Sequence, residues 1–184
     1  VQYVNIEINT NDSSVTYPTS WMKTLGSIVT RNADVPSLTG ASALLGDSEG
    51  GLFIEFSTFE NTDNKRISIS DGTQGNRILL AFIGSSLFFI ATSTTEQASI
   101  SGGTYSANTF YKVLMRYSVN DFGLHIGGSE TGTDTSGTTF SDGTLTNIQL
   151  DSGSGTGVPF YGRIRQLVNF NQSPTSTQGN SITA

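Results

Sequence analysis

The 184-residue chain contains no cysteine and a single histidine, His125. Without cysteine there is no disulfide, no thiol nucleophile and no thiolate metal site. Zinc is effectively excluded as well, because zinc sites take most of their ligands from cysteine and histidine. A serine-type catalytic triad is not expected, since nothing in the sequence around His125 completes one.

Charge is also scarce. Charged residues make up 13% of the chain, the formal net charge is −6 and the pI is about 4.5. Such a chain does not favour nucleic acid or an anionic membrane surface as a partner. No run of 18 apolar residues is present, so membrane insertion is not expected. The chain begins with Val1 and has no signal-peptide pattern, so we expect it to be processed or cut from a longer protein.

What the sequence has in quantity is strand signal, while amphipathic helical windows are scarce. Short apolar or alternating stretches, separated mostly by Gly, Asn, Asp or Ser, lie at 2–8, 51–57, 66–70, 77–83, 87–92, 97–101, 110–117, 122–126, 145–150 and 161–170. Residues 127–144 and 151–159 lack strand character and are expected to be loops. Many short strands with turn residues between them are typical of a sandwich or barrel. We therefore predict an all-β fold, a two-sheet antiparallel β-sandwich with little helix.

The stretch RISISDGTQGNRILL (66–80) is the clearest hairpin in the sequence. Ile69 precedes the turn and Ile78 follows it, so two arms can pair and bury one apolar stripe. Asp71 can accept a backbone N–H inside the turn, and Gly72 can adopt positive φ without steric cost. We predict that this turn is structural and that Asp71 is not a Ca²⁺ ligand.

Alternation also predicts which side chains share a face of the last strand, 161–170. Successive side chains of a strand point to opposite faces. Arg163, Arg165 and Leu167 are therefore expected on one face and Ile164 on the other.

Several segments together resemble a known family. They are YPTSWMKTLGSIVTRNADV (17–35), GDSEGGLFIEF (46–56), RISISDGTQGNRI (66–78) and YGRIRQLVNFNQSPT (161–175). Their order resembles the concanavalin A-like (laminin G-like) jelly-roll domain of bacteriophage tail fibres and other virion proteins. The resemblance covers residues 17–178. It implies that 1–16 hold a strand, either the end of a preceding module or part of this domain's own sheet, and that 179–184 form a C-terminal tail that is loose or packs on a partner.

The resemblance implies a non-catalytic domain on the virion surface that attaches to host cell-surface polysaccharide. A homotrimer and contacts with other virion proteins follow from the same likeness, and a purely structural fibre or decoration module is the alternative. Sugar binding requires an aromatic platform and polar groups at a rim. The aromatic candidates are Trp21, Phe59, Tyr105 and Phe122, and His125, expected on the outward face of its strand, is a polar candidate.

A glycoside hydrolase or polysaccharide lyase of the jelly-roll class is a second alternative, but glycoside cleavage requires two carboxylates. Glu55 lies on a predicted strand and lacks an acidic partner two residues further on. No cofactor is expected except Ca²⁺, which binds oxygen ligands such as those of acidic loops. The candidate Ca²⁺ ligands are Asp47, Glu49, Asp134 and Asp142, and turn capping is the alternative role for each.

Overall fold

The computed structural model describes residues 36–62, 65–155 and 157–184. The chain divides into two compact units, Val1–Asp34 and Val35–Ala184, and the described residues belong to the second unit. The predicted strand at 2–8 lies outside the described residues.

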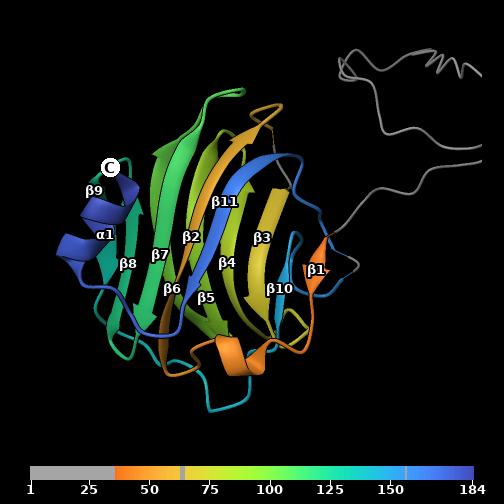
Figure 1. Cartoon of the computed structure of the whole chain (residues 1–184), viewed down its shortest axis with the longest axis vertical. Helices are drawn as coiled ribbons and strands as arrows, with labels where there is room; N and C mark the ends of the chain where they lie inside the picture. The colour runs from red at the N-terminus through yellow and green to blue at the C-terminus, as the bar shows by residue number, and fades with distance from the viewer. Residues whose placement is uncertain (1–35, 63–64, 156) are drawn as a thin grey trace, which may run out of the picture. The chain divides into compact units, whose positions relative to one another are not determined.

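The described residues form two antiparallel sheets (Figure 1). Sheet A has the strand order β1-β10-β3-β4-β5-β6, and sheet B has the order β11-β2-β7-β8-β9. The strands of sheet A are β1 (Ser37–Leu38), β10 (Asn147–Gln149), β3 (Lys65–Ser70), β4 (Asn76–Ile83), β5 (Ser86–Ser93) and β6 (Thr95–Thr104). Those of sheet B are β11 (Gly162–Phe170), β2 (Glu49–Thr58), β7 (Tyr111–Ser118), β8 (Asp121–Ile126) and β9 (Ser129–Asp134). A short 3-10 helix (Ser42–Leu44) and the helix α1 (Ser176–Thr183) complete these elements. The predicted two-sheet β-sandwich is confirmed.

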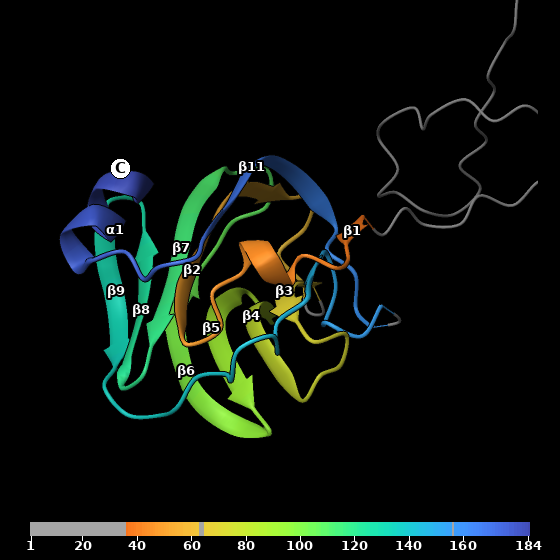
Figure 2. The ribbon, with the colours of Figure 1, turned by 60° about the horizontal axis from the view of Figure 1, so that its bottom comes forward.

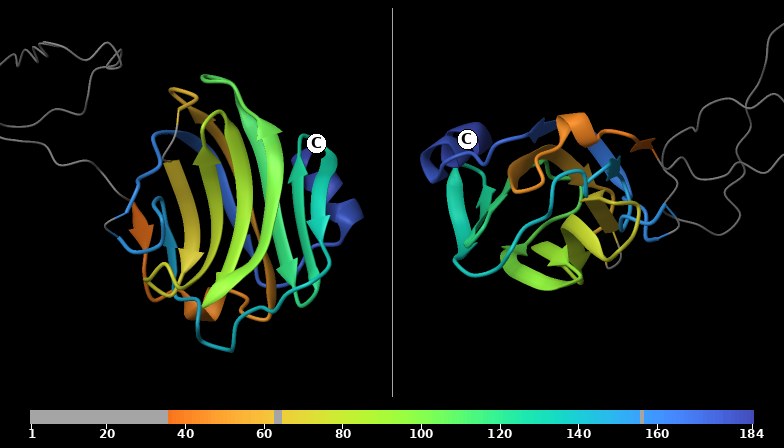
Figure 3. Two further views of the ribbon diagram at one scale, coloured as in Figure 1. Left: turned by 180° about the vertical axis from the view of Figure 1, so that it is seen from behind. Right: turned by 90° about the horizontal axis from the view of Figure 1, so that it is seen from below.

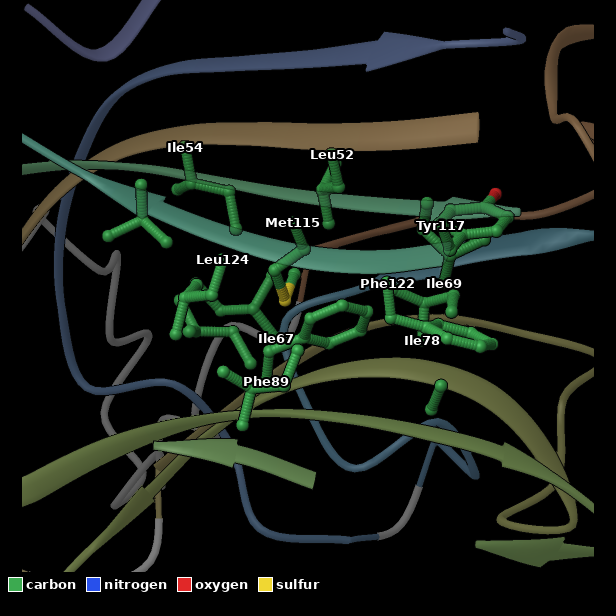
Figure 4. Packing of buried hydrophobic residues seen from close by; sticks show 14 of the residues in the cluster. Leu52, Ile54, Ile67, Ile69, Ile78, Phe89, Met115, Tyr117, Phe122 and Leu124 are labelled. Atoms are coloured by element: carbon green, nitrogen blue, oxygen red, sulfur yellow. The ribbon is translucent and has the colours of Figure 1, made fainter. Parts of the chain in front are cut away.

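The inner faces of the two sheets enclose a hydrophobic core (Figure 4). Leu52, Ile54 and Phe56 of β2 share the inner face and are fully buried, which fits the period of two of a strand. Full burial of one such side chain contributes roughly 1.5–3 kcal/mol relative to exposure. Phe122 also belongs to this core, so it is excluded as a sugar-binding ring.

The predicted hairpin at 66–80 is confirmed as the β3–β4 connection. In the register, Ile69 lies opposite Ile78, and both are fully buried. Asp71 Oδ1 accepts the Thr73 backbone N–H at 2.7 Å, and Gly72 has φ +88°. The turn thus has the chemistry that its sequence indicated.

The face assignment of 161–170 was wrong beyond Arg165, because β11 contains a β-bulge. Ile164 pairs with Phe56 and Gln166 with Glu55, so Arg165 is one extra residue in this strand. Such an insertion re-aims the side chains that follow it. Ile164 and Leu167 consequently both pack on the core, although strict alternation placed them on opposite faces.

Two other expectations from the sequence were wrong. Residues 129–134, expected to be loop, form β9 and pair with β8 along the edge of sheet B. Residues 179–184, expected to be a tail, largely belong to α1, which packs on β7, β8 and β9 (Figures 2 and 3). The Thr175 side chain caps this helix and forms a capping box with Gln178. No helix within the described ranges is long and apolar enough to cross a membrane.

Candidate functional site

The surface of sheet B that points away from the core, here called the outer face, is divided into a covered and an open part. The chain after β11 crosses this face on its way to α1 (Figure 1). Its Pro174 packs so closely that a Cβ placed on Gly51 would lie 3.0 Å from Pro174 Cδ. Beneath α1 and this crossing segment the outer-face side chains Phe53 and Leu114 are buried. The opposite end of β2, β7 and β11 carries polar and aromatic groups that are more exposed.

At that open end, aromatic rings and arginines form what we call the aromatic–arginine cluster: Phe59, Phe110, Tyr161, Arg163 and Arg165. Phe59 and Tyr161 meet edge to face with centroids 4.9 Å apart, and Tyr161 is 40% exposed. The Arg163 guanidinium carbon lies 4.9 Å from the Phe59 ring centroid. That of Arg165 lies 3.5 Å from the Phe110 centroid. Both distances are in the range of cation–π contacts.

Charged groups on β2 and β7 border the cluster. Glu55 lies between Arg165 and Lys112, because its Oε1 is 3.1 Å from Arg165 Nη1 and its β7 register partner is Lys112. The Lys112 ammonium donates to the backbone oxygen of Ala184. The side chain of Arg165 is 60% exposed, so it remains accessible from solvent. This surface combines ring faces with N–H donors, the groups that orient polar ligands.

A second feature of the outer face is a hollow of about 390 Å³ beside α1. Its lining is formed by Phe170, Gln172, Ser173, Pro174, Gln178, Ser181 and Ile182. Amides and hydroxyls predominate there over charged groups. The hollow and the cluster lie on the same face of β11, since Phe170 pairs with Gly51 and Arg163 with Ser57.

Of the predicted sugar-binding residues that the structure describes, only Phe59 lies in this surface. Phe59 is half-buried in the cluster. Tyr105 is 3% exposed and its ring packs edge to face on Phe82, while its hydroxyl donates to the Thr62 carbonyl at 3.0 Å. Tyr105 therefore offers no ring face to a ligand, because it fills the sandwich interior. Trp21 lies outside the described residues.

His125 does point to the outer face of its strand, but it is fully buried, contrary to the prediction of a solvated side chain. The reason is α1, which lies directly above the ring. Asn180 Oδ1 is 2.9 Å from His125 Nδ1, and Arg116 Nε donates to His125 Nε2 at 3.2 Å. A Cβ added at Gly179 would lie 2.7 Å from two atoms of the ring. The His125 ring therefore packs against α1 and is inaccessible to a sugar.

Arg116, next to His125, is the centre of a largely buried ionic group. Its guanidinium contacts Asp121 and Glu130, each at 2.7 Å. Ser176 of α1 donates a hydrogen bond to Glu130, also at 2.7 Å. Partial burial opposes the charge of Glu130, but the bonds from Arg116 and Ser176 outweigh it and hold the pKa of this carboxyl below its ordinary value. The network attaches α1 to the sheet.

The four candidate Ca²⁺ ligands have separate contacts in the structure. Asp47 is buried and accepts the backbone N–H groups of Gly143 and Leu145 at 2.8 and 2.7 Å. Glu49 accepts from a backbone N–H in the crossing segment, Asp134 closes a local turn, and Asp142 is an exposed loop residue. Among the described residues no three acidic or histidine side chains gather in a way that could hold a metal ion.

Sequence reasoning missed Phe110, Tyr161 and the two arginines as members of one site. The signal available for Tyr161, Arg163 and Arg165 was the composition of the 159–165 stretch, where two aromatic residues are followed by two arginines. Their convergence with Phe59 and Phe110 depends on pairing between segments about fifty and a hundred residues apart. That pairing is not visible in local periodicity.

A search of protein-family models gave no match, and a search of curated proteins gave none either. Solved structures do match. The CBM40 of the Ruminococcus gnavus IT-sialidase, bound to α2,3 sialyllactose, superposes with a TM-score of 0.65 at 15% identity, over 78% of this chain and 87% of the other. The fold is a jelly-roll β-sandwich.

Two further structures support that assignment. Domain 4 of AbnA, an extracellular arabinanase from Geobacillus stearothermophilus, was solved with arabinotriose and has a TM-score of 0.63 at 14% identity, over 77% of this chain and 69% of the other. Mouse laminin α1 domains LG4-5 give 0.55 at 11% identity, over 71% and 37%. The laminin G-like jelly roll that the sequence resemblance implied is confirmed as a fold. At such low identities the likeness shows the fold alone.

Proposed function

We propose that this domain binds carbohydrate on the outer face of sheet B and catalyses no reaction on it. The observation that carries the proposal is the aromatic–arginine cluster. Rings that are partly exposed and fixed by their neighbours can stack on the apolar face of a sugar. N–H donors beside them can bind its hydroxyl oxygens. The hollow beside α1, with its amides and hydroxyls, extends the same face.

The structural neighbours give independent support. The Ruminococcus and Geobacillus domains, which have the same fold, were solved with sialyllactose and arabinotriose. A jelly roll is therefore a scaffold on which glycan sites occur. Function nevertheless resides in particular residues and not in the fold, so the cluster has to be tested directly.

The proposal that the domain is not an enzyme rests on its carboxylates. Glycoside cleavage uses two carboxyl groups on either side of the scissile bond. Glu55, which lies on the open part of the outer face, is paired with Arg165. Asp47 is bound to backbone N–H groups in the interior. Release of reducing ends from a polysaccharide that persists through purification and disappears in Glu55→Gln would overturn this part of the proposal.

The more specific proposal is that the domain belongs to the surface of a phage virion, acts outside the cell as a trimer and attaches to host polysaccharide. This rests on the sequence resemblance alone. The competing function is a structural module with no receptor, which predicts that no glycan binds.

A glycan panel containing neutral and acidic oligosaccharides should be probed with the full chain. We expect at least one glycan to bind, and Tyr161→Ala to weaken that binding roughly tenfold, because one stacking aromatic contributes on the order of 1 kcal/mol or more. Phe88→Ala is the matched control, since Phe88 is a half-buried aromatic on β5 of sheet A. Absence of binding across the panel would favour the structural module, whereas equal losses in both variants would overturn the assignment of the site to the aromatic–arginine cluster.

A further inference from the structure

The β-bulge in β11 changes the chemistry of the outer face. Because Arg165 is the extra residue, it and Gln166 both lie opposite Glu55. The contact between Arg165 and Glu55 shows that the Arg165 side chain is on the outer face. Arg163 lies on the same face, where its guanidinium lies over Phe59. The bulge therefore keeps two arginines together while it turns Leu167 into the core.

Each of these guanidinium groups lies over a ring. The 3.5 Å separation of Arg165 from the Phe110 centroid is the van der Waals distance of two stacked planes. A stacked guanidinium is held in orientation through its face, while its N–H groups lie along its edges. Fixed N–H edges form a fork that matches a carboxylate or sulfate in two parallel hydrogen bonds.

Basic side chains gather on this surface although the chain as a whole is acidic. The chain has a formal net charge of −6. At the open end of the outer face, however, the described residues include the basic side chains Arg163, Arg165 and Lys112, beside the acid Glu55. Binding of a neutral sugar would not require basic side chains to gather on a domain whose net charge is negative.

Other arginines of the described chain are held by the fold. Arg116 is 5% exposed and paired with two acids. Arg66 donates to the carbonyl of Phe82, and Arg77 donates to the carbonyl of Ser152. Arg165, with 60% of its side chain exposed, differs from all three.

We infer that the glycan bound on the outer face of sheet B carries an acidic group, a carboxylate or sulfate, and that Arg163 and Arg165 hold it. The inference rests on the proposed carbohydrate-binding function and specifies its ligand class. Glu55 orients Arg165 in the absence of the glycan. Because Glu55 contacts the Arg165 guanidinium at Nη1, the other N–H groups of that guanidinium can bind the ligand.

The test uses pairs of glycans that differ only in the acidic group: lactose and 3′-sialyllactose, dextran and dextran sulfate, and esterified and de-esterified polygalacturonate. Affinity of the full chain for both members is measured at low and at physiological salt. We expect the acidic member of at least one pair to bind tenfold or more tightly, with a preference that decreases as salt rises. Arg163→Gln combined with Arg165→Gln should abolish the preference.

Arg66→Gln is the matched control, because it makes the same kind of charge change on sheet A. It is expected to keep the preference, and thermal melts should show that all variants are folded. Equal affinity for both members of every pair would overturn the inference and leave carbohydrate binding intact. Retention of the full preference by the double variant would likewise overturn the inference and leave carbohydrate binding intact. Absence of binding to any glycan would overturn the proposed function itself.

Discussion

The close approach of Gly179 to His125 allows a direct test of how α1 packs on sheet B. A Cβ at position 179 would lie 2.7 Å from His125 Cε1 and Nε2 and 2.8 Å from Cδ2. The ring cannot easily move, since Arg116 and Asn180 hold its two nitrogens. We therefore expect Gly179→Ala to place extra volume in a closed space, which typically costs about 1–3 kcal/mol.

An opposing effect has to be subtracted. Alanine is a better helix former than glycine by about 1 kcal/mol. The close approach to three ring atoms suggests the upper part of the overpacking range, so the net loss in unfolding free energy should be about 1–2 kcal/mol. For a domain of this size such a loss lowers Tm by roughly 2–8 °C. Chemical and thermal denaturation measure both quantities.

Two further variants distinguish this explanation from a general weakness of α1. Thr177→Ala, at an exposed position of the helix, should leave stability unchanged or slightly raise it. In a His125→Ala background the ring is absent, so Gly179→Ala should change sign and become neutral or stabilising. If Gly179→Ala were as stable as the parent, or if its cost persisted without the ring, the helix would not lie on His125 as described.

Three other predictions concern the turn, a buried acid and the ionic group. Gly72→Val should cost roughly 1–3 kcal/mol in a thermal melt because of φ +88°, whereas Asp71→Asn should cost little, about 0.5–1 kcal/mol, since Asp71 Oδ2 also accepts from Asn76. Asp47→Asn should lower stability by about 1–3 kcal/mol, equally with Ca²⁺ and with chelator, because asparagine keeps one acceptor oxygen and leaves one of the two backbone N–H groups without a partner. Because the folded pKa of Glu130 is lowered, its stabilisation should be lost as pH falls through that value. Amide protection in α1, corrected for the intrinsic pH dependence of exchange, should then decrease, and Glu130→Gln should remove this pH dependence of protection.

The strands and their buried faces were predictable because each depends on local pattern. The alternation of Leu52, Ile54 and Phe56 identifies the inner face of β2, since a period of two is imposed by the strand itself. The hairpin at Asp71-Gly72 was predictable for a similar reason: turn geometry requires particular residues at neighbouring positions. Both features need no knowledge of distant parts of the chain.

The bulge at Arg165 and the strand β9 were not predictable in this way. An extra residue in a strand leaves the sequence alternation of β11 looking regular, and only the register against β2 shows it. The sequence SETGTD of β9 has no apolar side chain to mark a strand, and this edge strand is held by its pairing with β8, with Gly132 lying close to Ile100 of the core.

Helix α1 represents an intermediate case. Its segment contains Gly179 and mostly polar side chains, so no apolar stripe indicated a helix. A T-x-x-Q capping box at Thr175 and Gln178 was nevertheless present in the sequence as a start signal. The helix also depends on tertiary contact, since short isolated helices are marginal in water. Here that contact is supplied by His125, more than fifty residues earlier in the chain, which no local reading could include.

These elements together explain why the outer face of sheet B has two different halves. The C-terminal crossing segment and α1 cover one half, and the polar groups there, Arg116 and His125, are satisfied by partners within the chain. Buried charges require such partners, because an unpaired one is costly. On the other half the bulge presents Arg165 to solvent over Phe110, with an edge that the chain itself leaves accessible. The same sheet thus uses arginine once to hold its own helix and once in a position from which a ligand can be held.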